Sequence, residues 1–538
     1  MMRFFRYLHL TLGAAFLLQA YTASSQTPGT PGTNDKFNTL LYYIEQMYVD
    51  SVDSERLVEH AIVSMLQELD PHSVYISKED LAAANEPLQG NFEGIGIQFN
   101  IMKDTIFVVN PIPGGPSEKL GIIAGDKIVT VDGENVAGIG IKNNDVMKLL
   151  KGPKGTMVKV GIKRRGARKP IEFEIRRDKI PIYSVDASYM IDNKTGYIKV
   201  NRFAKTTMKE LRDAIVELKM AGMDALVLDL QGNGGGLLNT AIEMADELIS
   251  DNKLLVYTEG RSFPKDETYS RRPGLFEKGK LVVLIDEGSA SASEIVAGAV
   301  QDWDRGLIIG RRSFGKGLVQ RPVQLPDGSA VRLTVQKYYT PSGRCIQKPY
   351  DEGFEAYQSE KYKRFETGEL LTGDHEEFPD SLKYTTNVRK RTVYGGGGIT
   401  PDIFVAIDTS YASEYFNDLL RKGIANQFVL EYVDKNRAAL NGQYTSADAF
   451  IANFSVSKDL EKAFIDYATK EGVVYKADDW KTSEFAIDTR LKALIGRNLF
   501  DYDVFYQVIN VLNPAYVKAV KTLKDGTFER ADLAHRDF

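Results

Sequence analysis

The sequence has almost no cysteine, few histidines and no excess of basic residues. Cys345 is the only cysteine among 538 residues, which excludes an intramolecular disulfide framework and a cysteine-ligated zinc site. The five histidines are scattered and show no HExxH or similar spacing, so a metal-dependent hydrolase is not indicated. With 68 basic and 73 acidic residues, the net charge of −5 offers no basic surplus for nucleic acid. We expect no metal, no cofactor and no nucleic-acid partner.

Long apolar runs are also scarce, and the one that stands out lies at the start of the chain. Arg3 and Arg6 precede an apolar run over residues 8–20, and small or polar residues follow as far as Gln26. This order is typical of a secretory signal peptide, and the run is shorter than the roughly 20 residues of a membrane span. We predict a signal peptide at residues 1–26 and an exported protein. Membrane association would require that the signal stays uncleaved, because no cysteine lies nearby for a lipid anchor.

Several domains are expected, because 538 residues exceed what one hydrophobic core usually organises. The hydrophobic and charged fractions, 43% and 26%, are those of globular proteins. Apolar residues recur at helical spacing within residues 27–88, which predicts an N-terminal helical region. The helical pattern ends at Asp70, since a residue that precedes a proline disfavours helical dihedral angles. We interpret the nearby His72 as a turn residue with local hydrogen bonds rather than a catalytic one.

From about residue 91 the pattern changes to short β-strands. Alternating apolar residues over 158–175 predict a β-hairpin, and residues 144–150 predict a short amphipathic helix. The hairpin turn, residues 163–170, is rich in Lys and Arg, and we interpret it as a solvated turn rather than a docking patch.

Four motifs in this β-rich stretch resemble those of a PDZ domain, which we assign to residues 89–178. The motifs are FEGIGI at 92–97, PSEKLGI at 116–122, GDKI at 125–128 and VDG at 131–133. PDZ domains bind extended C-terminal peptides by adding a strand to a sheet edge, and loop amides bind the terminal carboxylate. The resemblance implies that the loop and the start of the edge strand are formed by Gly94, Ile95, Gly96 and Ile97. The alternative is a β-rich domain whose glycines only form turns.

After residue 196 strands alternate with helices. Three apolar strands, at residues 224–230, 281–286 and 307–310, run into unusual loops. The first loop, residues 232–236, is rich in glycine, and the second, residues 288–294, is rich in serine. The third, residues 313–317, has a glycine on each side of a lysine. Parallel sheets place ligands at the carboxyl ends of their strands, so we expect the three loops to meet at one site.

Ser291, Lys316 and Gln320 are the candidate catalytic side chains of this site. A serine hydroxyl needs a base, and with no histidine nearby Lys316 is the candidate. The lysine must be uncharged to act as a base, which requires burial, and burial lowers the pKa of an amine by up to roughly 3–5 units. Gln320 could orient the amine without adding charge, whereas an acidic neighbour would counteract the arrangement.

The backbone supplies the predicted oxyanion hole. The amide of Ala292, just after the nucleophile, is one candidate donor, and that of Gly235 or Gly236 is the other.

Two other interpretations of these loops remain. Ser291 and Glu294 have the spacing of a capping box, so the serine could only cap a helix. The glycine turn could bind phosphate, but GxxxxGK[ST] and GxGxxG are absent.

Over residues 36–405 the chain closely resembles the C-terminal processing peptidases, or tail-specific proteases. The motifs that carry the resemblance are LDPHS at 69–73, LDL at 228–230, GSASASEI at 288–295, FGKG at 314–317, VQ at 319–320, YTPSGRCIQ at 339–347 and GITPD at 398–402. The resemblance implies a Ser/Lys/Gln site at Ser291, Lys316 and Gln320. It also implies that the protein is an endopeptidase that recognises substrate C-terminal tails through its PDZ domain. The same resemblance favours a location in a Gram-negative periplasm. Where the family commonly has Arg and Pro, this chain has Gln231 and Gly234, which leaves the oxyanion glycine open.

The expected fold is multidomain α/β, and the resemblance implies a crotonase/ClpP-like α/β catalytic core at residues 179–405 that carries the inserted PDZ domain. Residues 349–391 are interpreted as a surface excursion with solvated charges. Residues 406–538 are a predicted C-terminal helical region, which could mediate homo-oligomerisation or adaptor binding. Two alternative functions are a non-catalytic PDZ scaffold and a crotonase-type acyl-CoA enzyme, although an exported protein is not expected to meet CoA.

Overall fold

The computed structural model describes residues 32–373, 379–531 and 533, so the predicted signal peptide lies outside the described residues. The chain divides into two units, Met1–Glu68 and Leu69–Phe538. Among the described helices, none is both long enough and apolar enough to cross a membrane.

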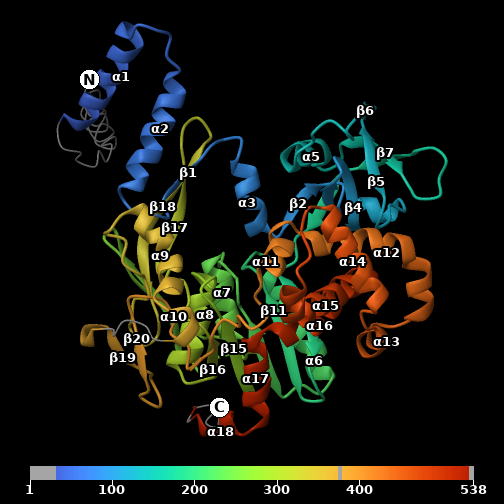
Figure 1. Cartoon of the computed structure of the whole chain (residues 1–538). Coiled ribbons are helices and arrows are strands. Elements are labelled where there is room, and N and C mark those ends of the chain that lie inside the picture. The colour runs from blue at the N-terminus through green and yellow to red at the C-terminus, as the bar shows by residue number, and fades with distance from the viewer. Residues whose placement is uncertain (1–31, 374–378, 532, 534–538) are drawn as a thin grey trace, which may run out of the picture. The chain divides into compact units, whose positions relative to one another are not determined.

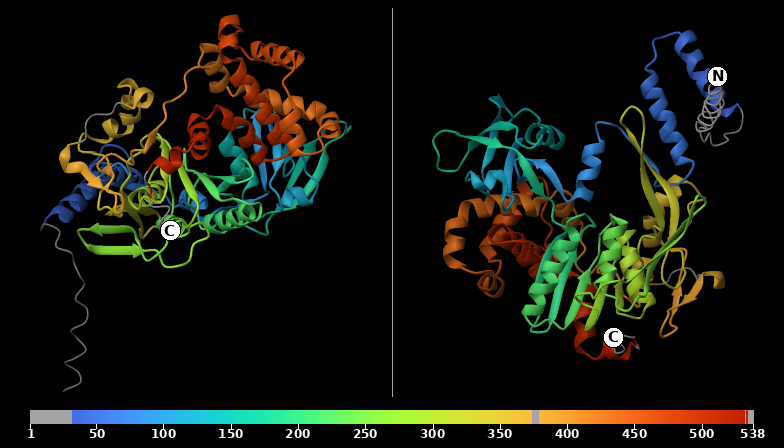
Figure 2. Two further views of the ribbon diagram at one scale, coloured as in Figure 1. Left: turned by 90° about the horizontal axis from the view of Figure 1, so that it is seen from below. Right: turned by 180° about the vertical axis from the view of Figure 1, so that it is seen from behind.

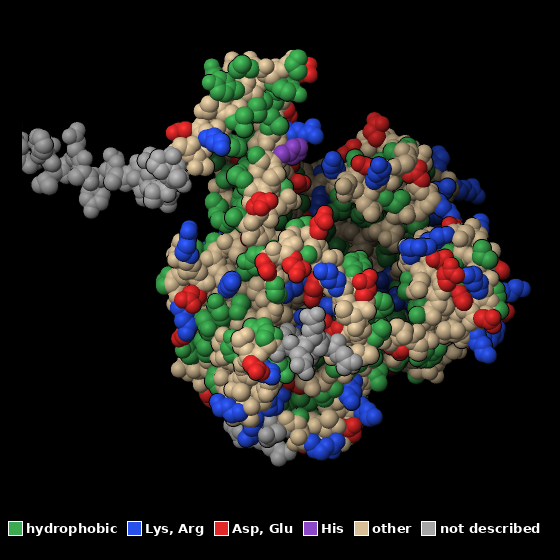
Figure 3. Space-filling model, turned by 60° about the vertical axis from the view of Figure 1, so that its left-hand side comes forward, with side chains coloured by type: hydrophobic (Ala, Val, Ile, Leu, Met, Phe, Trp, Pro, Cys, Tyr) green, Lys and Arg blue, Asp and Glu red, His purple; other side chains and the backbone are tan. Residues whose placement is uncertain are grey.

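The first unit contains two helices, α1 (Thr33–Met47) and α2 (Ser54–Gln67). The side chain of Asp53 caps α2 by accepting the Arg56 N–H at 3.1 Å. Large apolar side chains lie exposed on both helices and between them, among them Leu40, Tyr43, Met47, Val49 and Met65. Figure 3 shows hydrophobic surface in green over this part of the molecule.

The PDZ-like stretch folds as an antiparallel sheet with the strand order β3-β4-β5-β7-β8. Its elements are β3 (Ile97–Met102), β4 (Thr105–Pro111), α4 (Pro116–Lys119), β5 (Lys127–Val131), β6 (Glu134–Asn135), α5 (Asn143–Leu150), β7 (Met157–Lys163) and β8 (Ile171–Arg176). The predicted hairpin is confirmed, since Val160 pairs with Phe173 across β7 and β8. Strands β2 (Asn91–Gly94) and β9 (Asp178–Pro181) pair where the chain enters and leaves this sheet.

The largest core surrounds a second sheet, whose strand order is β10-β11-β12-β15-β16-β21. These strands are β10 (Val185–Met190), β11 (Thr195–Val200), β12 (Ala225–Asp229), β15 (Lys280–Ile285), β16 (Leu307–Gly310) and β21 (Ile403–Phe404). All neighbours from β11 to β21 are parallel, as expected from the unbroken apolar strands, and β10 is an antiparallel edge.

Helices cover both faces of this parallel sheet (Figures 1 and 2). The first face packs against α6 (Thr207–Met220), α7 (Leu238–Asp246) and α8 (Ala292–Asp302). The second face packs against α17 (Pro514–Lys524) and α18 (Thr527–Arg530), through Ala515, Ala519 and Phe528. The end of the predicted C-terminal helical region therefore completes the core of the parallel sheet.

A third, antiparallel sheet has the order β1-β18-β13-β14, with β17 paired to β18. Its strands are β1 (Val74–Ile76), β13 (Leu254–Gly260), β14 (Phe263–Tyr269), β17 (Leu318–Gln324) and β18 (Ala330–Tyr339). Strand β17 follows the lysine-containing loop directly, so this sheet determines where Gln320 lies.

The interpretation of residues 349–391 as a surface excursion with solvated charges is wrong in part: many of its described charged side chains are exposed, but the stretch forms helices and strands and buries Arg364 and Glu369. It contains α9 (Phe354–Glu366), α10 (Glu369–Thr372), a 3-10 turn (Asp380–Leu382) and β19 (Lys383–Thr385), which pairs with β20 (Thr392–Tyr394). Arg364 is buried and its guanidinium contacts Glu369 at 3.0 Å, while Arg312 contacts the same carboxylate at 2.7 Å. Opposite charges neutralise one another here, which allows burial that isolated charges would not tolerate.

The remaining C-terminal helices form a separate core. They are α11 (Glu414–Arg421), α12 (Ile424–Gln443), α13 (Ala447–Asn453), α14 (Lys458–Lys470), α15 (Ala477–Leu499) and α16 (Tyr502–Ile509). Ser413, Ser446 and Ser457 begin three of these helices, and each side chain accepts the backbone N–H three residues later, which is the usual role of an N-cap serine.

Candidate active site

The structure brings the three unusual loops together at the carboxyl ends of β12, β15 and β16. The Asn233 carbonyl of the glycine turn accepts the Ala290 N–H at 3.0 Å and the Ser293 hydroxyl at 2.9 Å. The Ser289 carbonyl accepts the Phe314 N–H at 2.9 Å, which attaches the lysine-containing loop. Segments far apart in sequence thus form one hydrogen-bonded cluster, because parallel strands end at the same edge of the sheet.

Ser291 adopts a strained backbone conformation just before α8. Its φ of 54° and ψ of −111° lie outside the favoured regions for a residue with a side chain. The predicted capping box is present, but a serine that only caps a helix normally has extended dihedral angles. Gly235 lies directly against this turn, since a Cβ added there would be 2.9 Å from the Ser291 Cβ. Capping alone therefore does not account for the geometry of Ser291.

The carboxylate of Glu294 joins the serine loop to the lysine loop. Its Oε2 accepts the backbone N–H of Ser291 at 2.7 Å and that of Lys316 at 2.9 Å. Its Oε1 accepts the Gly315 N–H at 2.7 Å and the Ser313 hydroxyl at 2.5 Å. The side chain is fully buried, which raises the pKa of Glu294, while these four donors favour the charged form. Glu294 thus fixes the backbones of the two candidate catalytic residues relative to one another.

Lys316 has the environment that a lysine base requires. Its Nζ donates to Gln320 Oε1 at 3.1 Å, so its partner is a neutral amide. Burial lowers the pKa of Lys316; the nearby carboxylates of Asp70 and Glu294 oppose this shift without cancelling it, and Arg332 adds to it. Within the described part of the chain, no hydrogen bond joins Lys316 Nζ to Ser291 Oγ. The Tyr338 hydroxyl lies 2.7 Å from the Lys316 carbonyl and 3.1 Å from that of Ser291.

His72 is more than the turn residue that the sequence suggested. Its local bond is present, because its N–H donates to Asp70 Oδ1 at 2.8 Å. Its carbonyl also accepts the side-chain amide of Gln320, and its Nε2 lies 2.7 Å from the Tyr357 hydroxyl. Burial and the charge of Lys316 lower the pKa of His72 to about 4, so the ring is neutral at neutral pH. The LDPHS segment thus holds Gln320, a contact that spans 248 positions and leaves no local signal in the sequence.

The candidate oxyanion donors lie beside Ser291, and their amides are used differently. The Gly235 N–H donates to Asn233 Oδ1 at 2.9 Å, whereas the next residue, Gly236, has a φ of 148° and packs on Phe203. Ala292 begins α8 at the serine turn. Helix α17 also reaches the start of the glycine turn, because Asn513 donates its Nδ2 to Gln231 Oε1 at 2.8 Å.

The candidate peptide-binding residues lie at the start of the PDZ sheet. Gly94 ends β2, Ile95 and Gly96 form the connection, and Ile97 begins β3. The side chains of Ile95 and Ile97 are buried in the PDZ core, so these residues can offer only their backbone to a ligand. Among the described strands, β3 pairs only with β4 and lies at an edge of its sheet, the position where a peptide strand could add.

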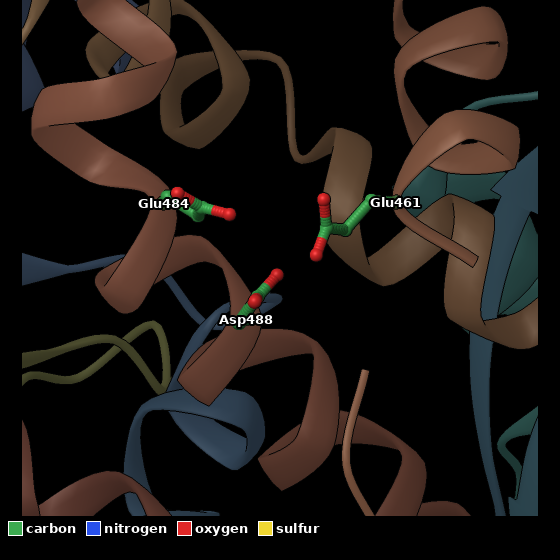
Figure 4. Close-up of side chains that lie close together, drawn as sticks. All are labelled: Glu461, Glu484 and Asp488. Atoms are coloured by element: carbon green, nitrogen blue, oxygen red, sulfur yellow. The ribbon is translucent and has the colours of Figure 1, made fainter. Parts of the chain in front are cut away.

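One group of carboxylates among the described residues is close enough to hold a cation, and it lies in the C-terminal helices. Glu461, Glu484 and Asp488 point toward one another (Figure 4), with ligand atoms within 4.8 Å. Lys458 neutralises part of this charge through contacts of 2.8 Å with Glu461 and 2.7 Å with Glu484. The group belongs to none of the three active-site loops.

Comparison with known proteins identifies the family. A sequence model of peptidase family S41 matches residues 194–355. The carboxy-terminal processing protease CtpB of Bacillus subtilis is 32% identical over 431 residues, which cover 79% of this chain and 85% of that protein. This chain belongs to peptidase family S41. CtpA of the same organism is 39% identical over 315 residues, 58% of this chain and 66% of that protein. A solved photosystem II D1 C-terminal processing protease covers 69% of this chain and 92% of its own, with 28% identity and a TM-score of 0.35.

Further matches describe the other parts of this S41 peptidase. A PDZ model matches residues 107–164, and a model of the N-terminal domain of the activating protease CtpB matches residues 16–80. Residues 415–501 match a family of unknown function. The protein is therefore a multidomain α/β serine peptidase of the C-terminal processing type with a PDZ domain, as its motifs predicted. This membership argues against both a catalytically silent scaffold and an acyl-CoA enzyme.

Proposed function

We propose that the protein is an exported endopeptidase that cleaves proteins selected by their C-terminal tails. Ser291 is the nucleophile, Lys316 the general base, and Gln320 the residue that orients the amine. The observation that carries this assignment is the shared carboxylate: Glu294 Oε2 holds the Ser291 and Lys316 backbones together, next to an amine that burial makes less basic.

The reaction would proceed as acyl transfer. The neutral Lys316 amine takes the hydroxyl proton as Ser291 Oγ bonds to the scissile carbonyl carbon, and the carbonyl oxygen becomes the oxyanion. The Ala292 N–H and a glycine-turn N–H stabilise that charge; we assign the glycine to Gly236, because the Gly235 N–H already has an acceptor. The peptide C–N bond then breaks, and the Lys316 ammonium returns the proton to the departing amine.

Deacylation repeats the same proton path. Lys316 removes a proton from water, the hydroxide oxygen bonds to the acyl carbon, and the ester bond to Ser291 Oγ breaks as the proton returns to that oxygen. The absence of a Ser291–Lys316 hydrogen bond in the free enzyme is consistent with this scheme, since catalytic hydrogen bonds often tighten only in the substrate complex.

Substrate selection is assigned to the PDZ domain. A C-terminal tail would add as a strand to the open edge of β3, with the backbone of residues 94–97 facing its carboxylate. The same proposal includes a crotonase/ClpP-like core at residues 179–405, and a periplasmic location directed by residues 1–26.

The test compares cleavage of an unfolded protein with a free tail and the same protein with an amidated C-terminus. Ser291→Ala and Lys316→Ala are expected to abolish turnover, whereas Lys337→Ala, at an exposed lysine of β18, retains it. Amidation should raise KM and leave kcat for saturating substrate nearly unchanged. Cleavage that persists in both active-site variants contradicts the catalytic assignment, and equal cleavage of both substrates contradicts recognition by the tail.

A further inference from the structure

Part of the outer face of the PDZ sheet packs against α12 of the C-terminal helical region. Met102, Phe107 and Val109 form one small apolar cluster with Leu430 of α12, and all four are buried. Their strand neighbours Ile106 and Val108 point the other way, into the PDZ core. Side chains alternate between the two faces of a strand, so α12 contacts the back of the sheet.

Charges of opposite sign surround this apolar contact. Lys103, at the β3–β4 turn, donates to Glu431 at 2.7 Å. One turn further along α12, the Asp434 carboxylate lies against Gly125 and 3.9 Å from Arg165. The basic hairpin turn is thus not simply solvated: Arg165 faces α12, while Arg164 pairs with the buried Asp126 at 2.7 Å. The PDZ side of the contact is basic and the α12 side is acidic.

The contact leaves the peptide-binding edge uncovered by α12. The apolar cluster and the ion pairs use Met102 at the far end of β3, the β3–β4 turn, β4 and the β7–β8 turn, and they include neither the start of β3 nor any residue of α5. A tail would add at the free edge of β3, and the end of α5 lies close to the start of that edge, because Gly94 forms a β-bridge with Lys151, the C-cap of α5. Binding of a tail and contact with α12 are therefore compatible.

The contact is also small and incompletely packed. A cavity of about 490 Å³ remains between the two sides, lined by Lys103, Phe107 and Arg165 of the PDZ domain and by Glu431, Asp434 and Lys435 of α12. Ion pairs with exposed members contribute little each and weaken as salt screens them. Such a contact can hold a domain in place and still separate.

We propose that α12 is a docking surface for the PDZ domain of the same chain, built from Leu430, Glu431 and Asp434. Docking by the back of the sheet holds the peptide-binding edge at a set place relative to Ser291. This assigns a role to the region that matches a family of unknown function. Docking concerns only where the PDZ domain lies, so the proposal does not depend on Ser291 being the nucleophile.

The test measures PDZ placement directly by energy transfer between two dyes. In a Ser291→Ala, Cys345→Ser background, cysteines at Ile139 of the PDZ domain and Val517 of α17, both exposed, carry the dyes. Lys103→Glu and Glu431→Lys should each broaden and shift the transfer distribution, and the double variant, which restores an opposite pair, should return it to the wild-type form. Lys159→Glu is the matched control, because Lys159 pairs with Glu174 inside the PDZ domain.

Two outcomes would overturn the proposal: distributions unaffected by either single reversal, or a double variant that behaves as the sum of the two. Rising KCl should shift the wild-type distribution in the same direction as the single variants. Binding of a tail peptide should keep its wild-type affinity in Lys103→Glu, which shows that the PDZ domain is still folded. With Ser291 intact, the Lys103→Glu variant should cleave substrates over a wider range of distances from their C-terminus. If the wild-type enzyme itself cleaves no substrate, that result counts against the proposed function and not against docking.

Discussion

The backbone N–H groups of Ser291 and Lys316 donate to the same atom, Oε2 of Glu294, at 2.7 and 2.9 Å. A nucleophile and its base are usually positioned by a hydrogen bond between their side chains, whereas here a third residue binds both of their main chains. The separation of the two loops is therefore fixed before substrate arrives, and only the side-chain rotamers of Ser291 and Lys316 remain to be aligned. Such preorganisation reduces the entropic cost of reaching the reactive geometry.

Replacing Glu294 by glutamine should damage catalysis more than binding. Whichever way the amide turns, its nitrogen replaces one carboxylate oxygen and faces at least one backbone N–H that is itself a donor, either that of Gly315 or those of Ser291 and Lys316, so the loops should shift. We expect Glu294→Gln to lower kcat by about 10²-fold with little change in KM, and to destabilise the fold by about 1–3 kcal/mol. Steady-state kinetics and urea unfolding measure both. Glu259→Gln, at an exposed glutamate of β13, should match wild type in each, and a Glu294→Gln enzyme with normal kcat would contradict the positioning role.

The pH dependence of kcat/KM should follow the amine of Lys316. Because burial lowers the pKa of Lys316, activity is expected to rise with pH and to reach its midpoint below 10.5. Arg332 contributes to the lowering, so Arg332→Gln should move the midpoint to higher pH, and Gln320→Glu, which places a carboxylate beside the amine, should move it further.

Profiles between pH 5 and pH 10 on a tail-bearing substrate measure these shifts. Arg321→Gln serves as the control, since Arg321 is exposed on β17. A midpoint that stays in place in Gln320→Glu would show that another group titrates.

Whether a part of this site can be predicted from the sequence depends on how far apart along the chain the interacting residues lie. The loops after 230, 286 and 310 were predictable, because apolar strands and helices alternate around them and parallel strands end together. Glu294 was visible only as a capping partner, since Ser-x-x-Glu has a sufficient local explanation. The contacts of His72 with Gln320 and of Asn513 with Gln231 cross 248 and 282 positions, and nothing in either segment indicates them. The paired charges of Arg364 and Glu369 look in sequence like solvated ones.

The bond between Asn513 and Gln231 should couple α17 to the glycine turn. Asn513 both caps α17, through the N–H groups of Ala515 and Tyr516, and donates to Gln231. Asn513→Ser keeps a capping oxygen but is too short to reach Gln231, so kcat should fall several-fold while stability changes by less than about 0.5 kcal/mol. Asn513→Ala should lower kcat in the same way and should also lower the free energy of unfolding by about 1 kcal/mol, because it removes the capping oxygen.

A double-mutant cycle tests this coupling. Gln231→Ala should lower kcat as much as Asn513→Ser does, and the combination should add nothing further, because both changes remove one bond. Independent, additive losses would show that the two residues act separately.

The stability of the C-terminal helices should depend on the protonation of Asp488. Burial and the carboxylates of Glu461 and Glu484 raise the pKa of Asp488 to about 7, and Lys458 only partly opposes this. In the unfolded chain an aspartate titrates near pH 4. Between about pH 4 and pH 7 the unfolded state therefore ionises more readily than the folded one, so this group makes the fold progressively less stable as pH rises through that interval.

Asp488→Asn removes the ionisation and should be more stable than wild type at pH 8, by about 1 kcal/mol once solvent screening of this partly exposed group is allowed for. At pH 4 the two proteins should differ little from this cause, since Asp488 is then protonated in the folded state. Urea unfolding at the two pH values measures the difference, with the exposed Asp466→Asn as control. If millimolar Ca²⁺ stabilises wild type and Asp488→Asn loses that stabilisation, the carboxylates hold a cation and the repulsion argument fails, because a bound cation would favour the ionised form.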